Sequence, residues 1–342
     1  MRIGYSMWGF LGAGVVDTPD GSRSYRRPLV DALLASGHQV VFLQTNRDLI
    51  EAGDDLRHRY AWRDGFPDLD ALILEWRWPL PGRNTTPCGT AGHTCDLHRQ
   101  AELLGWYTNA QSLPTVLWDL DRQLPSDHPL RARPNVSLCE LAMSPTPGAT
   151  TLLCPVDDAA LDAADPAALA AMPRPVPLVY VGNQYERDEA FTKFFARPAL
   201  WFDHRVAGKW TRTEAWPHIN FTGRCAFGDV ARIHAGALAT VLLLPERYAE
   251  VGHMTSRLPE ALLAGCLPIV PADIAHVLMF APPVLHAADG REVVARVEWL
   301  RRIAGGREHA DLIASCLRLL EPFRLSRQVN TLNAALGAVP AC

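Results

Sequence analysis

The first half of the chain alternates short apolar runs with longer stretches of helical spacing. The runs are rich in β-branched residues and too short for helices, which predicts buried strands. They cover Arg2–Met7, Gln39–Leu43, Ala71–Glu75, Thr115–Leu120, Val136–Met143 and Thr151–Val156. A helix is predicted over Ser22–Ala35, with Gly37 where a glycine commonly ends a helix. Continuous apolar strands separated by helices are typical of a parallel sheet covered on both faces.

The pattern pauses after residue 156 and then begins again. Residues 157–175 are rich in Ala, Asp and Pro, which is typical of a connection between domains. Further strands are predicted at Leu178–Val181, Arg205–Ala207, Ala239–Leu244 and Leu267–Pro271. Helices are predicted at Arg187–Phe195, Asp229–Ala235, Ser256–Ala264, Gly290–Ile303 and Ser326–Leu336, with one more between Gly306 and Glu321. We therefore predict an α/β protein with two Rossmann-like domains, residues 1–156 and 176–322, and a ligand cleft between them.

Composition narrows the class of protein without naming a function. The 342 residues carry a formal charge of −4, with 48% hydrophobic and 20% charged residues, as in ordinary globular proteins. This balance gives no overall basic field for nucleic acid, although a local basic face stays possible. No apolar run is long enough to span a membrane, and the N-terminus resembles a first strand rather than a signal peptide. We expect a cytoplasmic protein.

The eight cysteines are scattered along the chain, which argues against a disulfide framework in a protein of this size. Cys88, His93, Cys95 and His98 form a denser group. Their spacing does not match the paired close ligands of a zinc finger. A loop running into a helix is therefore the favoured interpretation, and metal binding stays open.

Two segments of the second half place polar residues at the carboxyl ends of predicted strands, where open α/β sheets bind ligands. The first, VYVGNQYERD, brings Gly182, Asn183 and Arg187 behind a strand. Arginine can hold a diphosphate through a forked pair of hydrogen bonds. The second, VAGKW, places Lys209 after a strand and a glycine, where its charge could offset that of a departing nucleotide. Both side chains could equally lie on solvated surfaces.

A third segment, TSRLPEALLAGCLPIVPADI, predicts a short helix, a glycine turn and a buried strand. Glu260 falls in the first turns of the helix, where the helix dipole favours a carboxylate that could accept hydrogen bonds from ribose hydroxyls. A residue of the helix start without a ligand is the alternative. Gly265 allows the tight reversal into the strand.

The order G-N-x-Y-x-R, then G-K, then R-x-x-E-A-x-x-A-G-x-x-P-I resembles the donor half of GT-B glycosyltransferases, and among them the group 1 branch with spore-maturation-type proteins. The match covers Leu178–Asp273. The resemblance implies a C-terminal domain that binds a nucleotide sugar and an N-terminal domain that presents the acceptor. The last helix, within residues 323–342, is expected to cross back to the N-terminal domain. A retaining reaction without a metal or other cofactor is implied, with the nucleotide diphosphate sugar as co-substrate.

The resemblance also implies roles for residues. Glu260 is expected at the ribose, and Arg187 and Lys209 at the diphosphate, where both would also assist catalysis. The other expected donor residues are Gly182, Asn183, Thr255 and Arg257. Many relatives carry a second glutamate eight residues before the ribose glutamate, where this chain has Gly252. We take His253 and Thr255 as substitutes, with a catalytic role for His253.

Acceptor-side candidates lie in the loop WGFLGAG or at the ends of predicted strands: Gly12, Gly14, Glu75, Trp76, Asp119 and Asp121. The glycines let a substrate come close. The carboxylates can orient an acceptor hydroxyl, and Asp119 is the candidate base. The tryptophan offers a flat face for a sugar ring. The carboxylates could instead cap loops, and the tryptophan could pack in a core.

Glycosyl transfer is the preferred prediction, with two alternatives. A nicotinamide-dependent oxidoreductase would use the first glycine loop, but that loop reads G-x-x-G-x-G rather than G-x-G-x-x-G. A non-catalytic protein that binds nucleotide sugars is compatible with Gly252. The donor base and sugar stay open. So does the acceptor, which could be a small molecule, a glycan, a protein or modified DNA.

Overall fold

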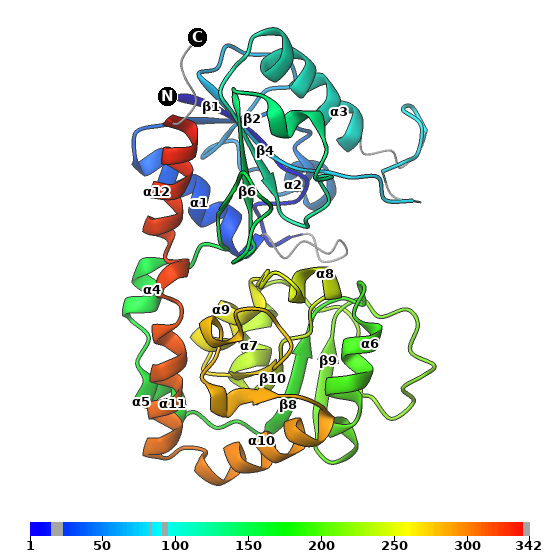
Figure 1. The fold of residues 1–342 in the computed structure, drawn as a ribbon, viewed down its shortest axis with the longest axis vertical. Helices are drawn as coiled ribbons and strands as arrows, with labels where there is room; N and C mark the ends of the chain where they lie inside the picture. The colour runs from blue at the N-terminus through cyan, green and yellow to red at the C-terminus, as the bar shows by residue number, and fades with distance from the viewer. Residues whose placement is uncertain (15–22, 82–83, 91–94, 338–342) are drawn as a thin grey trace. The chain divides into compact units, whose positions relative to one another are not determined.

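The structure, a computed structural model of the chain, describes residues 1–14, 23–81, 84–90 and 95–337. The chain divides into two compact units. Of the described residues, those in 1–14, 23–153 and 325–337 form the N-terminal unit, and those in 154–324 form the C-terminal unit. Each unit is built on its own parallel sheet, and helices cover the sheet (Figure 1).

The N-terminal unit contains a seven-stranded parallel sheet in the order β3-β2-β1-β4-β5-β6-β7. Its strands are β1 (Arg2–Ser6), β2 (Gln39–Phe42), β3 (Ala61–Trp62), β4 (Ala71–Glu75), β5 (Thr115–Asp119), β6 (Val136–Glu140) and β7 (Ala149–Thr151). The prediction of a strand at Thr151–Val156 is wrong in its position. β7 pairs with β6 from Leu138 to Glu140, where β6 ends, so residues beyond Thr151 have no strand to continue along. The two-residue β3 was not predicted, because it is too short to show a pattern.

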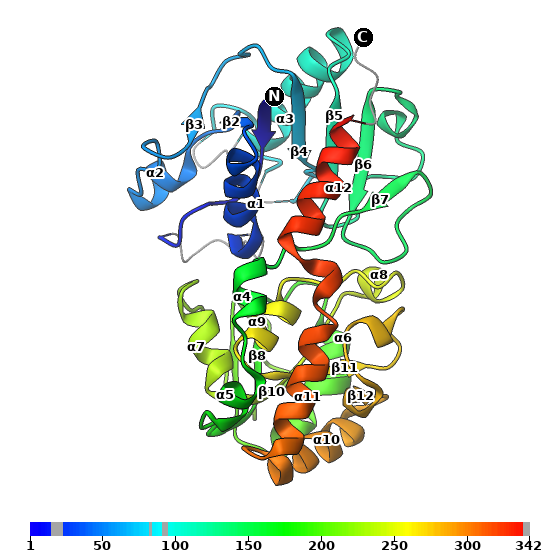
Figure 2. The ribbon, with the colours of Figure 1, turned by 90° about the vertical axis from the view of Figure 1, so that its left-hand side faces the viewer.

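The helices of the N-terminal unit include the last helix of the chain. They are α1 (Arg23–Ala35), α2 (Arg47–Ala52), α3 (Asp96–Leu103), the π-helix η1 (Leu104–Ala110), the 3-10 helix η2 (Pro129–Ala132) and α12 (Leu325–Gly337). α12 packs against α1 (Figures 1 and 2). Gln328 Oε1 accepts a hydrogen bond from Leu153 N at 2.8 Å, and Ser137 Oγ donates to Ala335 O at 2.9 Å. The predicted return of the last helix to the N-terminal domain is therefore confirmed.

The C-terminal unit contains a five-stranded parallel sheet in the order β12-β11-β10-β8-β9. Its strands are β8 (Val176–Val181), β9 (His204–Ala207), β10 (Ala237–Val241), β11 (Leu267–Pro271) and β12 (His286–Ala287). Its helices are α4 (Asp158–Asp162), α5 (Pro166–Ala171), α6 (Asp188–Phe191), α7 (Asp229–Ala235), α8 (Glu246–Ala249), α9 (Arg257–Leu263), α10 (Gly290–Ile303) and α11 (Arg307–Arg318). The short helices are η3 (Thr192–Ala196), η4 (Pro198–Leu200), η5 (Val277–Met279), η6 (Pro283–Leu285) and η7 (Glu321–Phe323). Two parallel α/β sheets were predicted, and two are present.

The stretch 157–175, predicted as a connection, folds into two short capped helices of the C-terminal unit. The Asp157 carboxylate accepts a hydrogen bond from Ala159 N at the start of α4, and Asp165 accepts from Ala167 N at the start of α5. Pro166 occupies the first turn of α5, where its missing N–H is not needed. α5 packs against α11 (Figure 2).

The helix predicted over Arg187–Phe195 is split into α6 and the π-helical turn η3. The change in winding falls at Thr192, whose hydroxyl donates to the Asp188 carbonyl at 2.8 Å. Trp216 Nε1 lies 3.1 Å from the same hydroxyl oxygen. Side-chain bonds of this kind compete with the regular helical ladder, and they hold the loop after β9 on this helix.

Arg174 joins four elements, α5, α7, β10 and the end of α9, at the amino edge of the C-terminal sheet. Its guanidinium donates to five main-chain carbonyls, those of Leu169, His234, Ala235, Ala237 and Ala264, at 2.8 to 3.4 Å. Gly265 makes room for it, because a Cβ there would lie 2.2 Å from Arg174 Nη2, and its φ of +73° also favours glycine. The predicted tight turn at Gly265 is thus also a packing site, and it sets where α9 ends and β11 begins.

None of the helices in the described part of the chain is both long enough and apolar enough to cross a lipid bilayer.

Candidate functional site

The C-terminal sheet has a point where the chain reverses its direction of winding. From β8 the chain moves to β9 on one side, and it returns to β10 on the other side of β8. Loops that leave neighbouring strands in opposite directions leave room for a ligand beyond the carboxyl ends of those strands. The predicted donor segments at 182–187 and 253–260 follow β8 and β10, so they flank this point.

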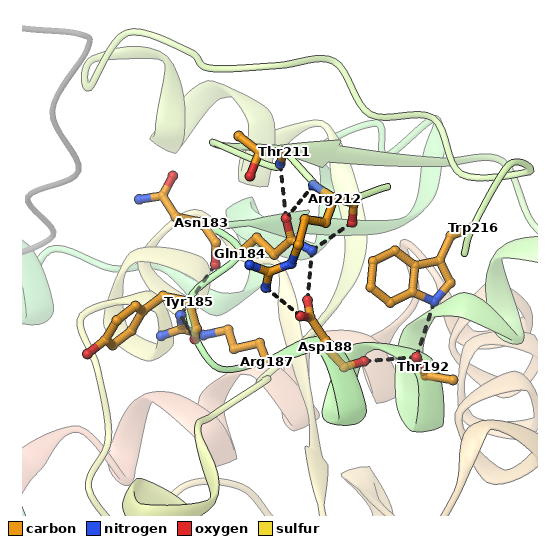
Figure 3. Close-up of polar contacts among 9 residues, drawn as sticks. All are labelled: Asn183, Gln184, Tyr185, Arg187, Asp188, Thr192, Thr211, Arg212 and Trp216. Carbon is orange, nitrogen blue, oxygen red and sulfur yellow. Dashed lines mark hydrogen bonds and ion pairs between the residues drawn. The ribbon is translucent and has the colours of Figure 1, made fainter. Parts of the chain in front are cut away.

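The loops after β8 and β9 are fastened to each other by side-chain amides (Figure 3). Asn183 Oδ1 accepts a hydrogen bond from Lys209 N at 2.7 Å. Gln184 Oε1 accepts from the amides of Thr211 and Arg212, both at 2.9 Å. Lys209 is exposed, and its ammonium has no ion pair among the residues that the structure describes. The two loops form a preorganised platform that carries this free cation.

Arg187 is buried beneath the same platform (Figure 3). Its guanidinium donates to the carbonyls of Leu243, Asn183 and Tyr185 at 3.1, 3.3 and 2.7 Å. These bonds join the loop after β8 to the segment after β10. The side chain therefore shapes the loop, and its predicted contact with a diphosphate stays a prediction.

Arg257, the first residue of α9, crosses the reversal point. Its Nε donates to Val181 O at 2.7 Å, and Nη1 donates to Thr255 Oγ1 at 3.2 Å. Gly182 permits this approach, because a Cβ at that position would lie 2.5 Å from Arg257 Nε. The structure thus brings together three predicted donor residues, Gly182, Thr255 and Arg257. It also gives a steric reason for glycine at position 182.

Glu260 lies in the first turn of α9, as predicted, and keeps part of its surface exposed. Its negative charge acts on the buried thiol of Cys154. Burial raises the pKa of that thiol, and the nearby Glu260 carboxylate raises it further. The start of α9 therefore presents a carboxylate and, one turn before it, the Arg257 guanidinium.

Gly252 and His253 form a tight corner between α8 and α9. Gly252 has a φ of +61°, a conformation that side-chain-bearing residues adopt at a cost. His253 is buried, and its ring stacks on Tyr248 with centroids 3.9 Å apart and planes 6° apart. The backbone thus gives a local reason for glycine at the position where the family resemblance led us to expect a glutamate. The catalytic role of His253 stays a prediction.

The predicted acceptor residues of the N-terminal unit are largely engaged in internal contacts. Glu75 is buried and forms a two-pronged ion pair with Arg26, Nε to Oε1 at 2.7 Å and Nη2 to Oε2 at 2.8 Å. Tyr5 donates to the same carboxylate at 3.0 Å. Burial raises the pKa of Tyr5 above its ordinary value, and the Glu75 charge adds to this. This geometry supports a structural role for Glu75 at the centre of the sheet.

The glycine loop is closed by a carboxylate that the sequence did not single out. Asp48, in α2, accepts hydrogen bonds from the amides of Leu11 at 3.1 Å and Gly12 at 2.8 Å. Burial raises the pKa of Asp48. A Cβ on Gly12 would lie 2.3 Å from Asp54 Oδ2, whereas Gly14 is exposed. Because α2 is a single short helix without a clear apolar period, only the preceding N-cap residue, Asn46, could have predicted it.

Asp119 also accepts main-chain hydrogen bonds. It ends β5, is buried, and accepts from Gln123 N at 2.9 Å and Leu124 N at 2.7 Å. Burial raises the pKa of Asp119. Asp121 is partly exposed, and the half-buried Trp76 packs on the core and meets the His128 ring at 5.3 Å. Their acceptor roles stay predictions.

A cavity of about 270 Å³ opens at the carboxyl ends of β1, β2 and β4 in the N-terminal unit. None of the predicted acceptor residues lines it. Its walls are Ser6, Met7, Leu43, Gln44, Thr45, Arg47, Asp64, Arg77, Cys95, Asp96, His98, Arg99 and Glu102. The cavity was not predicted, although the polar residues QTNRD after the second strand could have indicated it, because parallel strands end together at one edge of the sheet. A second hollow, of about 660 Å³, lies in the C-terminal unit beside α6 and includes Gln184, Arg212 and Trp216.

Solved structures share this fold along the whole chain. The β-glucosyltransferase of phage T4 (BGT), in complex with UDP and Mn²⁺, has a TM-score of 0.66 at 11% identity, covering 98% of this chain and 99% of its own. AviGT4, a glycosyltransferase of avilamycin A biosynthesis, has a TM-score of 0.59 at 14% identity, with 99% and 97% covered. A glycosyltransferase from Rickettsia africae has a TM-score of 0.58 at 10% identity, with 100% and 99% covered.

No family model matches the sequence, and a search of curated proteins finds no match either. The structural likeness shows that the chain has the GT-B glycosyltransferase fold, as predicted. At these identities it does not assign the group 1 branch.

Proposed function

We propose that this protein transfers a sugar from a nucleoside diphosphate sugar to an acceptor hydroxyl. The observation that carries the proposal is the start of α9, where Arg257 is fastened to the carboxyl end of β8 and Glu260 follows one turn later. Open α/β sheets commonly bind nucleotides where the strand order reverses, with the N-terminus of a helix next to the carboxyl ends of the strands. The likeness to BGT, whose structures contain UDP or UDP-glucose, supports the same conclusion.

In this proposal the residues divide into ligand contacts and supports. The Glu260 carboxylate accepts hydrogen bonds from the ribose hydroxyls. Lys209 and Arg257 lie nearest the diphosphate and stabilise the negative charge that grows on it as the bond to the sugar breaks. Arg187 acts mainly through the loop that it holds. Asn183 positions Lys209 through the amide contact already described.

We propose the cavity of the N-terminal unit as the acceptor pocket. Glu75 and Asp119 have their oxygens bound by donors inside the fold, whereas the exposed Asp64 lies at the cavity wall. A carboxylate facing the cavity can orient an acceptor hydroxyl and take its proton as the new glycosidic bond forms. Three arginines and three carboxylates among the lining residues fit a polar acceptor.

A thermal-shift and calorimetry screen against UDP-, GDP-, ADP-, CMP- and dTDP-linked sugars tests the donor part. One donor class should raise the melting temperature in a concentration-dependent way, because ligand that binds only the folded state stabilises it by mass action. Incubation of that donor with acceptors should then release the nucleotide. No shift with any donor would contradict the proposal. Binding without transfer or hydrolysis would favour the non-catalytic alternative.

Stereochemistry and metal use are the finer parts of the proposal. We propose a retaining reaction that needs no metal, in line with the family resemblance and with the cationic groups at the platform. Proton NMR of the first-formed product gives the anomeric configuration, and an inverted product would refute retention. Nucleotide release should survive EDTA, and strict restoration by added Mg²⁺ or Mn²⁺ after EDTA would refute metal independence.

The acceptor panel needs to include DNA. Besides small hydroxylated molecules, glycans and proteins, it should contain duplex DNA whose bases carry a hydroxyl group. BGT is described as a DNA-modifying enzyme. Transfer to that duplex and not to unmodified DNA would identify modified DNA as the acceptor.

The oxidoreductase alternative is weakened by the glycine loop. In dinucleotide-binding loops the backbone amides approach the pyrophosphate. Here the amides of Leu11 and Gly12 are already bound by Asp48. Calorimetry with NAD(H) and NADP(H) should show no binding, and micromolar binding of either would revive this alternative.

A further inference from the structure

Two cysteines and a histidine from separate turns of the N-terminal unit come together at the start of α3. Cys88 lies in the loop before the helix, Cys95 is the N-cap residue, and His98 is in the first turn. The two sulfurs and one imidazole nitrogen all lie within 4.8 Å of one another. Cys88 Sγ is 3.3 Å from His98 Nδ1. His93, the fourth member of the group in the sequence, lies outside the described residues.

The spacing of these atoms is close to that of ligands around one tetrahedral ion. With metal–sulfur bonds of about 2.3 Å and metal–nitrogen bonds of about 2.0 Å, tetrahedral ligands lie about 3.5 to 3.8 Å apart. The Cys88 Sγ–His98 Nδ1 distance of 3.3 Å is close to this range. The other two pairs of ligand atoms are at most 4.8 Å apart, so they would have to move closer by about 1 Å at most to bind one ion. Rotation of exposed cysteine side chains is enough to supply it, because Cys88 is exposed and Cys95 half-buried.

A second, independent observation is the partner of the histidine. His98 presents Nδ1 to Cys88, and its other nitrogen, Nε2, lies 3.4 Å from Glu102 Oε1, one helical turn further along α3. Metal-binding histidines usually donate their second N–H to a carboxylate, which fixes the ring and its tautomer. Glu102 occupies the place of that carboxylate, at ion-pair distance from Nε2 of His98.

The backbone at Cys95 is also unusual. Its φ is +55°, in the left-handed region that non-glycine residues rarely enter. Such conformations persist where surrounding structure determines them, often at functional positions. Here the conformation places the Cys95 side chain beside Cys88 and His98 at the start of the helix.

We propose that Cys88, Cys95 and His98 bind one divalent ion of the zinc class, with Glu102 positioning His98. Thiolate and imidazole ligands favour zinc over the hard ions Mg²⁺ and Ca²⁺. Three protein ligands leave a fourth position for water or another group. Cys95, His98 and Glu102 also line the 270 Å³ cavity, so the ion would stand at its wall.

The test is metal binding by the full-length protein, purified without a metal-affinity tag. Elemental analysis should find close to one zinc per chain after dialysis. Titration of the metal-free protein with Co²⁺ should produce the absorption of a tetrahedral thiolate site, which zinc then removes. Cys88→Ser, Cys95→Ser and His98→Gln should each weaken zinc binding at least ~100-fold, because each removes one of three ligands. Cys225→Ser and His58→Gln, which change a half-buried cysteine and an exposed histidine elsewhere, should leave it unchanged.

Glu102→Gln distinguishes a metal site from a loop that merely needs these side chains to fold. Loss of an outer-shell carboxylate typically costs ~10- to 100-fold in metal affinity. We expect that loss with an unchanged circular dichroism spectrum and unchanged donor binding by the C-terminal unit. The proposal is overturned if the native chain binds zinc no more tightly than a variant that combines Cys88→Ser, Cys95→Ser and His98→Gln. It is also overturned if Cys88 and Cys95 form a disulfide in the freshly purified native protein. Neither result would bear on the proposed sugar transfer.

Discussion

Both sheets end in polar side chains at their carboxyl edges, but the two units use them differently. In the N-terminal unit Glu75 is bound by Arg26 and Tyr5, and Asp48 by main-chain amides. In the C-terminal unit the loops are fastened by other groups, so Lys209 stays exposed and Glu260 partly so. A polar residue after a strand can therefore be buried to hold a loop or kept at the surface, where it can meet a ligand, and the exposed fraction of the side chain distinguishes the two cases.

The largest effect is expected from the buried ion pair of the N-terminal unit. Arg26→Met should lower the free energy of unfolding of this unit by about 3 to 5 kcal/mol, because it leaves the Glu75 charge buried without its partner. Hydrogen exchange by mass spectrometry, which reports each unit separately, measures this. Glu51→Gln, which removes the partly exposed pair with Arg47, should cost less than about 1 kcal/mol. If Arg26→Met cost as little, the contrast between the buried Glu75 and the partly exposed Glu260 would fail.

The second prediction is that acid affects the two units in opposite directions. In the C-terminal unit, burial lowers the pKa of His234 to about 4. Because the unfolded side chain binds a proton near pH 6.5, the contribution of neutral His234 is complete above that pH. As the pH falls towards 4, about 3 kcal/mol of stability is lost. His309, whose pKa is also lowered by burial, acts in the same direction.

Asp48 and Asp119 in the N-terminal unit have raised pKa values, chiefly through burial. Their folded forms bind protons more readily than the unfolded chain does, so they favour folding as the pH falls from their raised pKa towards about 3.9. Hydrogen exchange at pH 7 and pH 5 compares the units. His234→Leu should flatten the pH dependence of the C-terminal unit, while His58→Gln should leave it in place. A steep dependence that survives His234→Leu would contradict the assignment.

A third, smaller effect tests the ligand side of the comparison. Glu260→Gln should weaken nucleotide binding about 10- to 100-fold, the value of a hydrogen bond to a charged group. Calorimetry with the donor found by screening measures it. Glu298→Gln, on the exposed face of α10, is the matched control and should bind like the native protein. Equal affinity in both variants would remove Glu260 from the site.

Lysine offers a similar matched pair. The chain has two lysines, Lys209 on the platform and Lys193, which pairs with Asp273. Lys209→Met should lower the rate of nucleotide release about 10- to 100-fold, because a cation near the departing diphosphate stabilises charge that develops in the transition state. Lys193→Met should change the rate less than twofold. The reverse order would point to the hollow beside α6 as the donor site.

The smallest effect concerns the corner at Gly252. Gly252→Ala should destabilise the C-terminal unit by about 1 kcal/mol, because alanine must adopt the positive φ seen there. Gly252→Asn should cost less, since asparagine enters this region more readily. Urea denaturation of the two variants compares them. Equal stability of all three forms would mean that the glycine is present for another reason.

Much of the fold was readable from the chain. Buried parallel strands require continuous apolar runs, so Ala71–Glu75 and Leu267–Pro271 were predicted at the positions that the structure shows. The helices Asp229–Ala235 and Gly290–Ile303 were predicted equally closely. The short elements α2 and β3 were missed, because a few residues cannot display a period.

The site was readable only in part. The order of motifs was enough to place Glu260 and Arg257 at one helix start, because both belong to a single local segment. The engagement of Arg187 by three carbonyls was not predictable, since those carbonyls come from two loops. The proximity of Cys88, Cys95 and His98 was not evident either, because their spacing matches no zinc-finger pattern.

The sequence by itself determined two sheets, the break between them and the amphipathic last helix, since each depends on the apolar pattern of neighbouring residues. Only the tertiary structure decided which polar side chains are consumed internally. Glu75 meets Arg26 across 49 positions, and Arg187 meets the Leu243 carbonyl across 56. The pattern of neighbouring residues cannot show partners so far apart in the sequence. Yet these partners decide whether a buried charge is stabilised, because an unpaired charge is costly to bury.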